Sequence, residues 1–169
     1  MFKVGMGCIY EKTHDGKPLK LVKDIKDELI NKFYKIHHEN FTKIVDNKLN
    51  ENNKVLIIDC HSFPKHPLPY EFNQEMDRPE ICIGTDNFHT SEKLKKSFGQ
   101  FFKELNFIVK YNEPFKGSIV PLKFYNKEIR VQSIMIEVRR DLYMNEQSGE
   151  KNNKFYEIKS VLENIIKKI

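Results

Sequence analysis

The sequence predicts an α/β fold in which a mixed sheet carries helices on both faces. Short apolar runs rich in β-branched residues indicate buried strands, whereas longer segments with apolar residues every three or four positions indicate amphipathic helices. These segments follow one another in the order helix, strand, strand, helix, strand, strand, helix, which is typical of a sheet covered by helices. No internal repeat or linker is visible, so we expect a single domain over residues 1–169.

The N-terminal part of the chain predicts a turn followed by a long helix. The pair Asp15-Gly16 is a turn signal between two short apolar segments and indicates a short hairpin or a loop. A helix is expected over about 24–49, beginning at Asp24, with one apolar stripe along its length. The stripe consists of Ile25, Leu29, Phe33, Ile36, Phe41, Ile44, Val45 and Leu49. His37 falls on this stripe and is expected to be packed at the edge of the core, and His38 lies beside it.

The remaining elements are four strands and two helices. Strands are expected at 55–59, 80–84, 107–111 and 131–138, all in one sheet. The first of these is apolar throughout and is therefore expected to be buried on both faces. Helices are expected at about 90–105, with Thr90 or Ser91 as the cap, and at 154–168.

Composition excludes several classes of protein. The 29 basic and 24 acidic residues give a net charge of +5, but the basic residues are scattered, so we expect no nucleic-acid partner. No apolar run approaches the ~20 residues of a membrane span, and no signal peptide is visible, so we expect a cytoplasmic protein without a membrane partner. The three cysteines, Cys8, Cys60 and Cys82, are far apart, and buried free thiols are expected at Cys60 and Cys82 rather than disulfides.

Polar residues follow the first strand at once and predict a site there. Asp59 and His61 are two positions apart and therefore point to the same side of a strand. The carboxyl ends of strands are where ligands bind in open α/β sheets, so this pair suits a metal ligand or an acid–base group. The alternative is a strand-end histidine that is hydrogen-bonded to a neighbouring loop.

Glu137 is the unusual residue of the fourth strand, because it follows the apolar run at 134–136. A buried carboxylate must be paired or hydrogen-bonded, or its pKa rises. A pKa near neutrality suits a general base that acts through water, whereas the alternative is a structural ion pair with Arg139 or Arg140. If Glu137 and His61 belong to one site, their side chains should face a common cleft.

Further along the chain, Lys116 lies in a turn with Gly117, and Arg78 precedes the second strand. Either cation could bind an anionic group, and either could be an ordinary surface residue.

Six segments together resemble the N-formylglutamate amidohydrolase family, and they occur in its order over most of the chain. They are Gly5-Met-Gly-x-Ile-Tyr10, Tyr34-x-x-x-His38, Ile58-Asp-Cys-His-Ser-Phe-Pro64, Arg78-Pro-x-x-x-Ile-Gly-Thr-Asp86, Asn112-x-Pro-Phe-Lys-Gly117 and Ile136-Glu-Val-Arg-Arg-x-Leu-Tyr-Met-Asn-Glu146.

This resemblance implies a three-layer fold like that of the zinc exopeptidases and hydrolysis of the amide of a small N-acylated amino acid, such as N-formylglutamate of histidine degradation. It implies zinc as the cofactor, His61 as a zinc ligand and Glu137 as the general base. The substrate is a small carboxylate. The positions that the resemblance implies for binding it are Arg78, Asn112, Lys116, Arg139 and His38.

One departure from the family pattern concerns the metal. The family has an earlier segment with a His-Ser-Gly-type motif and an acidic residue. This sequence shows no His-Ser-Gly or His-x-x-Glu motif before Asp59, and no early acidic residue in the expected context. Because catalytic zinc generally needs about three protein ligands, we expect weak zinc retention and little hydrolysis of N-formylglutamate by this chain. The alternative function is that of a catalytically inactive chain that binds a small carboxylate or a partner protein.

Overall fold

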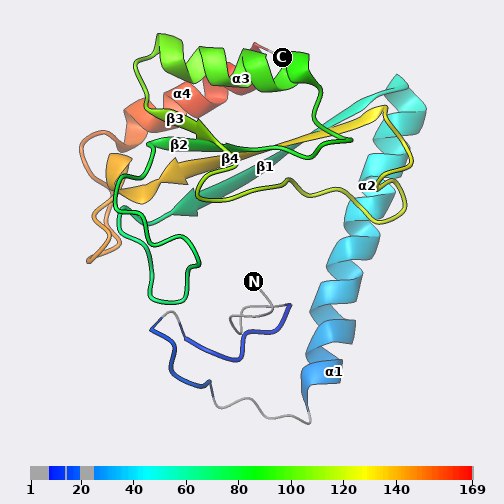
Figure 1. The fold of residues 1–169 in the computed structure, drawn as a ribbon. Helices are drawn as coiled ribbons and strands as arrows, with labels where there is room; N and C mark the ends of the chain where they lie inside the picture. Colours follow the sequence, from blue (N-terminus) through cyan, green and yellow to red (C-terminus); the bar gives the residue numbers. More distant parts are fainter. Residues whose placement is uncertain (1–7, 14, 20–24, 169) are drawn as a thin grey trace.

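The computed structural model describes residues 8–13, 15–19 and 25–168, which form an α/β fold around a four-stranded mixed sheet (Figure 1). Its strands are β1 (Val55–Phe63), β2 (Ile81–Gly84), β3 (Val109–Tyr111) and β4 (Val131–Arg139). Their order across the sheet is β1-β4-β2-β3. β1 runs parallel to β4, and β2 runs antiparallel to β4 and parallel to β3. The prediction that these four segments share one sheet is confirmed.

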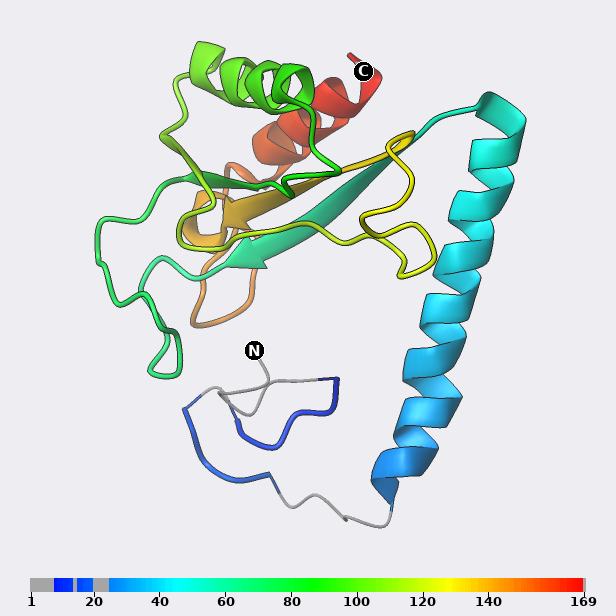
Figure 2. The ribbon, with the colours of Figure 1, turned by 45° about the vertical axis from the view of Figure 1, so that its right-hand side comes forward.

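Two helices cover one face of the sheet. They are α3 (Glu92–Glu104) and α4 (Phe155–Lys167), which Figure 1 and Figure 2 both show on the same side. Ser91 caps α3 by accepting a hydrogen bond from the Leu94 amide at 3.3 Å, as the sequence predicts. The core beneath the helices is built from side chains of both helices and of β2 and β4: Ile81, Ile83, Phe98, Phe102, Ile134, Ile136, Val138, Ile158 and Ile165.

The long N-terminal helix is continuous but changes its hydrogen-bonding pattern. It consists of α1 (Lys26–Leu29), a π-helical stretch (Ile30–Lys35) and α2 (Ile36–Asn52), and the predicted start at Asp24 lies outside the described residues. It ends at Asn53, whose positive φ of 57° closes the helix. Among the described residues no helix is long and apolar enough to cross a membrane.

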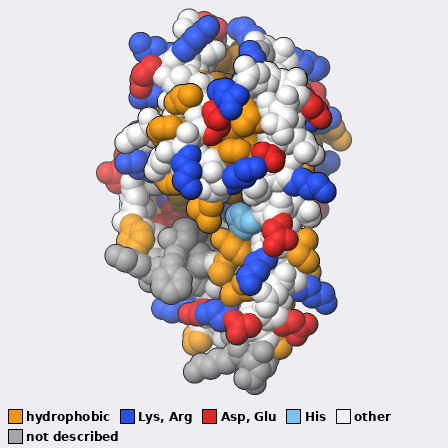
Figure 3. Space-filling view, turned by 90° about the vertical axis from the view of Figure 1, so that its right-hand side faces the viewer, with side chains coloured by type: hydrophobic (Ala, Val, Ile, Leu, Met, Phe, Trp, Pro, Cys, Tyr) orange, Lys and Arg blue, Asp and Glu red, His pale blue; other side chains and the backbone are white. Residues whose placement is uncertain are grey.

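The predicted apolar stripe of this helix is only half buried. Val45 and Leu49 pack against Val131 and Phe124 on the face of the sheet opposite α3 and α4. Phe33 and Ile44, by contrast, are 59% and 60% exposed. The reason is geometric, because the helix projects beyond the sheet and only its C-terminal turns meet the strands (Figure 2). Figure 3, which looks at this side, shows hydrophobic side chains at the surface between charged ones.

The prediction for His37 is therefore wrong. Its side chain is exposed on the projecting part of the helix, with its ring 6.4 Å from that of Phe41 and 5.2 Å from that of His38.

A loop completes the face of the sheet that α2 covers only in part. Residues 112–127 cross this face, and Ser133 Oγ on β4 donates a hydrogen bond to the Ile119 carbonyl oxygen at 2.8 Å. The loop lies so close to β2 that a Cβ atom on Gly84 would be 2.3 Å from the Gly117 carbonyl oxygen. Only glycine allows this approach. Helices thus lie on both faces, but the second face is covered mainly by a loop.

A buried histidine that the sequence analysis did not single out ties this loop to the sheet. His89 is fully buried, its Nδ1 lies 2.7 Å from the Val131 carbonyl oxygen, and its Nε2 accepts a hydrogen bond from the Asn126 amide at 2.9 Å. Both ring nitrogens are thus used within the fold, which indicates a structural role.

The first strand differs from its prediction in two respects. β1 continues past Asp59 to Phe63, where Pro64 ends the ladder, and it lies at the edge of the described sheet. Most of its residues are half-buried. An apolar run alone cannot distinguish an edge strand that is covered on its two faces from a central strand.

The N-terminal segment contains the predicted turn. Lys12 and Pro18 form an antiparallel bridge around Gly16, whose φ is +81°. Lys26 Nζ at the start of the long helix pairs with Glu11 at 2.8 Å. His14 and the motif residues Gly5 and Gly7 lie outside the described residues.

Candidate functional site

The register of the sheet brings the two predicted chemical residues together. His61 on β1 aligns with Glu137 on β4, and Cys82 on β2 aligns with Glu137 from the other side. Aligned residues on neighbouring strands present their side chains to the same face. Because Ile136 and Val138 point into the core under α3 and α4, Glu137 faces the opposite side. His61 and Glu137 therefore share one face, as expected for a single site.

Asp59 orients the imidazole of His61. The Asp59 Oδ1 atom lies 2.8 Å from His61 Nε2, and the His61 side chain is 51% exposed. This is the same-side pair that the spacing of two predicts, rather than a hydrogen bond to a neighbouring loop. Nδ1 remains as the second ring nitrogen for a ligand or a proton, and the carboxylate on Nε2 fixes the orientation of the ring.

Glu137 lies in an environment that favours its neutral form. Glu137 is only 7% exposed, and burial raises the pKa of its carboxyl group to about 7. Electrostatic interactions with His61 and Arg140 lower this pKa, whereas those with Asp59 and Glu71 raise it. A carboxyl group that titrates near neutrality can both accept and return a proton at physiological pH.

The structural ion pair considered for Glu137 is not formed with Arg139. Arg139 Nε instead binds Asp141 Oδ1 at 2.7 Å, and Arg139 Nη1 donates to the Arg78 carbonyl oxygen at 2.8 Å. Arg139 thus holds the chain just before β2 against the end of β4.

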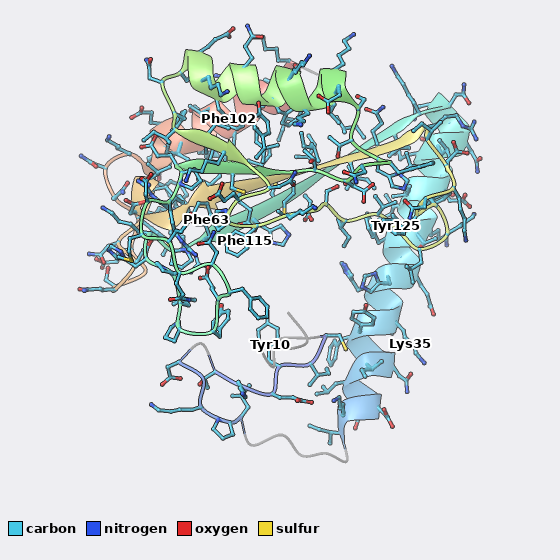
Figure 4. The ribbon with its side chains drawn as sticks, viewed as in Figure 1. Tyr10, Lys35, Phe63, Phe102, Phe115 and Tyr125 are labelled. Atoms are coloured by element: carbon cyan, nitrogen blue, oxygen red, sulfur yellow. The ribbon has the colours of Figure 1, made fainter. Side chains whose placement is uncertain are left out.

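Arg78 is buried in the rim of the site. Its guanidinium binds the carboxylate of Glu71 and donates through Nη1 to the Pro64 carbonyl oxygen at 3.0 Å. The guanidinium carbon also lies 5.6 Å and 5.8 Å from the ring centres of Phe63 and Phe115, which Figure 4 shows together under the end of β1. Arg78 therefore fastens the loop at 64–80 to the end of the strand.

The other predicted binding residues have partners elsewhere in the fold. The side chain of Asn112 exchanges two hydrogen bonds of 2.8 Å with Thr85, at the end of β2 that leads away from Arg139. Lys116 is exposed beside a hollow formed with Asp86. His38 lies on α2, with its ring 4.3 Å from that of Tyr34. Among the described residues no hydrogen bond or ion pair joins these three positions to Glu137, and their roles stay predictions.

Arg140 is a candidate that the sequence analysis treated only as a structural partner. Its Nε and Nη2 atoms donate to Ser62 Oγ and to the Ser62 carbonyl oxygen, each at 3.2 Å, and no ion pair involves it within the described part of the chain. It lies close enough to Glu137 and to Tyr70 to lower the pKa of both. The sequence gives no signal that separates Arg140 from Arg139, because only the fold shows which of them already has a carboxylate partner.

We expect Arg140→Ala to raise the pKa of Glu137 above about 7. The substitution removes a nearby positive charge that stabilises the carboxylate form. The measurement is a carbon-13 NMR titration of the Glu137 carboxyl group, with Arg140→Lys as the control that keeps the charge. An unchanged or lower pKa in Arg140→Ala would contradict the position of Arg140 beside Glu137.

The residues of this site do not form a complete zinc centre. His61 offers one imidazole, and no group of three His, Cys, Asp or Glu side chains that could hold a metal occurs among the described residues. Catalytic zinc generally has about three protein ligands. The donor set described here therefore does not fit zinc by itself.

Comparisons of the sequence and the fold with known proteins show what the chain is similar to. Residues 1–144 match the sequence model of the N-formylglutamate amidohydrolase family. The fold is similar to a crystal structure of N-formylglutamate amidohydrolase from Ralstonia eutropha, with a TM-score of 0.80 and 25% identity over 95% of this chain. It is also similar to a gene product of Agrobacterium tumefaciens, with a TM-score of 0.57 and 19% identity over 78% of this chain.

The chain spans 59% and 50% of the lengths of these two solved proteins. No protein among those with curated descriptions matches it.

Proposed function

The chain belongs to the N-formylglutamate amidohydrolase family, and we propose that it carries the general-base part of a site that hydrolyses the amide of a small N-acylated amino acid. N-formylglutamate is the proposed substrate, by the name of the family and of the Ralstonia eutropha relative. The proposal includes a three-layer architecture like that of the zinc exopeptidases, of which the described sheet and helices would be a part.

The observation that carries the proposal is the position of Glu137. Its carboxylate is buried at the ends of two parallel strands, beside an oriented imidazole, and on a face that a loop rather than a helix covers. A base in this position takes a proton from a water molecule, whose oxygen then attacks the amide carbonyl carbon. The same carboxyl group returns the proton to the leaving nitrogen as the carbon–nitrogen bond breaks. N-formylglutamate and water thus give formate and glutamate.

Arg140 supports the choice of an anionic substrate. Among the described residues the Arg140 guanidinium binds only Ser62, so it keeps donors for a carboxylate, and Arg140 lies near the proposed base. The guanidiniums of Arg78 and Arg139 bind Glu71 and Asp141. We therefore propose that these two arginines shape the substrate site by holding its rim in place, not by binding the substrate directly.

Asn112, Lys116 and His38 remain proposed substrate contacts. Their substitution by alanine should raise the KM for N-formylglutamate if they bind it.

We expect the purified chain to retain clearly less than one zinc per molecule after dialysis. The reason is that His61 alone, even with Asp59 beside it, supplies too few ligands for a catalytic zinc site. The measurement is metal analysis by mass spectrometry against protein concentration, with His61→Ala as the reference for non-specific binding. One zinc per chain, lost in His61→Ala, would show that further ligands are present in this chain.

The direct test of the proposed function is glutamate release from N-formylglutamate by the chain supplied with excess zinc, compared with the Glu137→Gln variant. Because the described residues supply too few zinc ligands, we expect slow turnover. The informative quantity is therefore the ratio of the two initial rates of glutamate release.

A second candidate function is carboxylate binding without catalysis. Two features of the described residues favour it: Arg140 has no carboxylate partner among them, and they supply too few ligands for a catalytic zinc. Calorimetric binding of glutamate that depends on Arg140, in a chain that releases none from N-formylglutamate, would identify this second function.

A further inference from the structure

Phe115, in the loop at 112–127, lies across β4 beside Glu137. Its carbonyl oxygen accepts a hydrogen bond from the Cys82 thiol on β2 at 3.3 Å, and its ring centre lies 5.6 Å from that of Phe63 on β1. Cys82 aligns with Glu137, and Phe63 aligns with the second residue beyond Glu137 on β4. Because these side chains share one face and β4 lies between β1 and β2, Phe115 crosses β4 next to Glu137.

Both ends of Phe115 are held in place. Cys82 is fully buried, and burial raises the pKa of its thiol to about 11, so the thiol keeps the proton that it donates to the Phe115 carbonyl oxygen. The ring packs edge to face on Phe63 and lies 5.8 Å from the guanidinium carbon of Arg78 (Figure 4). Phe115 therefore forms a fixed wall over this part of the sheet.

The opposite side of Glu137 carries charged groups. His61 adjoins Glu137 on β1. The first residue of β1 donates its amide hydrogen to the residue before β4, and backbone groups alternate along a strand, so Ser62 directs its carbonyl oxygen away from β4. Arg140 binds this oxygen and so lies on the outer side of β1. Across the sheet the order is Cys82, Glu137, His61 and Arg140.

A substrate of the proposed reaction thus meets two different surroundings at Glu137. The amino-acid part of N-formylglutamate carries two carboxylates, which suit the side of Arg140 and would lose hydration against an apolar ring. The remaining substituent of the reacting carbonyl carbon, a hydrogen atom in a formyl group, is then directed to the side of Cys82. This orientation places the acyl substituent between Glu137 and Phe115.

We propose that Phe115 determines which acyl group the site accepts, by limiting the room at the reacting carbonyl carbon to that of a formyl group. The inference rests on the proposed function, because it takes Glu137 as the base and Arg140 as a contact of the substrate carboxylate. A larger group, such as acetyl, would have to displace a ring that is held at both ends. Cys82 acts through Phe115 and is a positioning residue.

The test compares the binding of N-formylglutamate and N-acetylglutamate to the full chain by calorimetry, which does not depend on zinc. The original chain should prefer the formyl compound by about 10–200-fold, the usual discrimination of one methylene by an apolar pocket. Phe115→Ala should bring the two affinities close together by strengthening the binding of N-acetylglutamate. Cys82→Ala should act in the same direction but less strongly, because the ring remains and only its backbone anchor is lost. With zinc supplied, the ratio of glutamate release from the two compounds should change in the same way.

Phe101→Ala is the matched control. Phe101 is also a half-buried phenylalanine with an edge-to-face ring contact, at 5.3 Å from Phe102, but it belongs to α3 on the other face of the sheet. Its substitution should leave the preference for the formyl compound unchanged. Circular dichroism of each variant shows whether the fold is retained, and Phe115→Leu, which keeps a smaller apolar side chain, provides the same comparison if Phe115→Ala does not fold.

Two kinds of failure are distinguishable. A chain that neither binds N-formylglutamate nor releases glutamate from it would overturn the proposed function and this inference with it. A chain that binds both compounds equally well would overturn the inference alone. The same holds for a folded Phe115→Ala or Phe115→Leu that keeps the original preference, and for a Phe101→Ala that loses the preference to the same extent.

Discussion

Glu137→Gln should reduce glutamate release from N-formylglutamate by about 10²–10⁴-fold, the usual contribution of a general base. The amide has nearly the shape of the carboxylate but cannot take a proton from water. The pairing of β4 with β1 and β2 should be retained, because the substitution changes only a side chain. The measurement is the initial rate of zinc-supplemented hydrolysis for both proteins.

The pH dependence gives a second measure of the same role. Because the base form of Glu137 predominates only above its pKa of about 7, the rate should rise as the pH increases through 7. Arg140→Lys, which retains the charge near Glu137, should keep this profile. A rate that Glu137→Gln leaves unchanged, or a profile that rises only near pH 4 to 5, would contradict the assignment.

The stability of Glu137→Gln is the control that tests whether unfolding causes the loss of activity. The pKa of Glu137 is raised from 4.5 to about 7 in the folded chain, so the folded state binds the proton more tightly than the unfolded state does. The free energy of unfolding therefore falls as the pH rises from 4.5 to 7. Glu137→Gln removes this charge, so above pH 7 the variant should be at least as stable as the original chain in thermal unfolding.

The strands and helices could be predicted because each is encoded by a local pattern. The apolar run at 55–58, the cap at Ser91 and the spacing of Asp59 and His61 all concern residues close in sequence. The shared face of His61 and Glu137 followed from their places at strand ends, although they are far apart in the chain.

What could not be predicted depends on contacts between distant segments. The edge position of β1 depends on strand order, and the exposure of Phe33 and His37 depends on how far the long helix extends beyond the sheet. A periodic pattern predicts which residues share a helix face but not whether anything packs against that face. Likewise, Arg78 reads as a surface cation until the fold shows it enclosed with Glu71.

That enclosed pair leads to the largest expected change in stability. The Arg78 and Glu71 side chains are 2% and 7% exposed, so removal of one leaves the other charge buried without its partner. We expect Arg78→Met to lower the free energy of unfolding by about 3–5 kcal/mol, as is typical when one partner of a buried pair is removed. Urea unfolding followed by circular dichroism provides the measurement.

The chain contains a matched control for this effect, since Lys123 and Asp46 form an ion pair of 2.6 Å at the surface. Lys123→Met should cost at most about 1 kcal/mol, because water screens an exposed pair. Combining Arg78→Met with Glu71→Leu should recover part of the loss, because no unpaired charge remains in the rim. If Arg78→Met were as mild as Lys123→Met, the Arg78–Glu71 pair would not fasten the loop at 64–80. If the double variant were no more stable than Arg78→Met alone, the unpaired charge of Glu71 would not be the cause of the loss of stability.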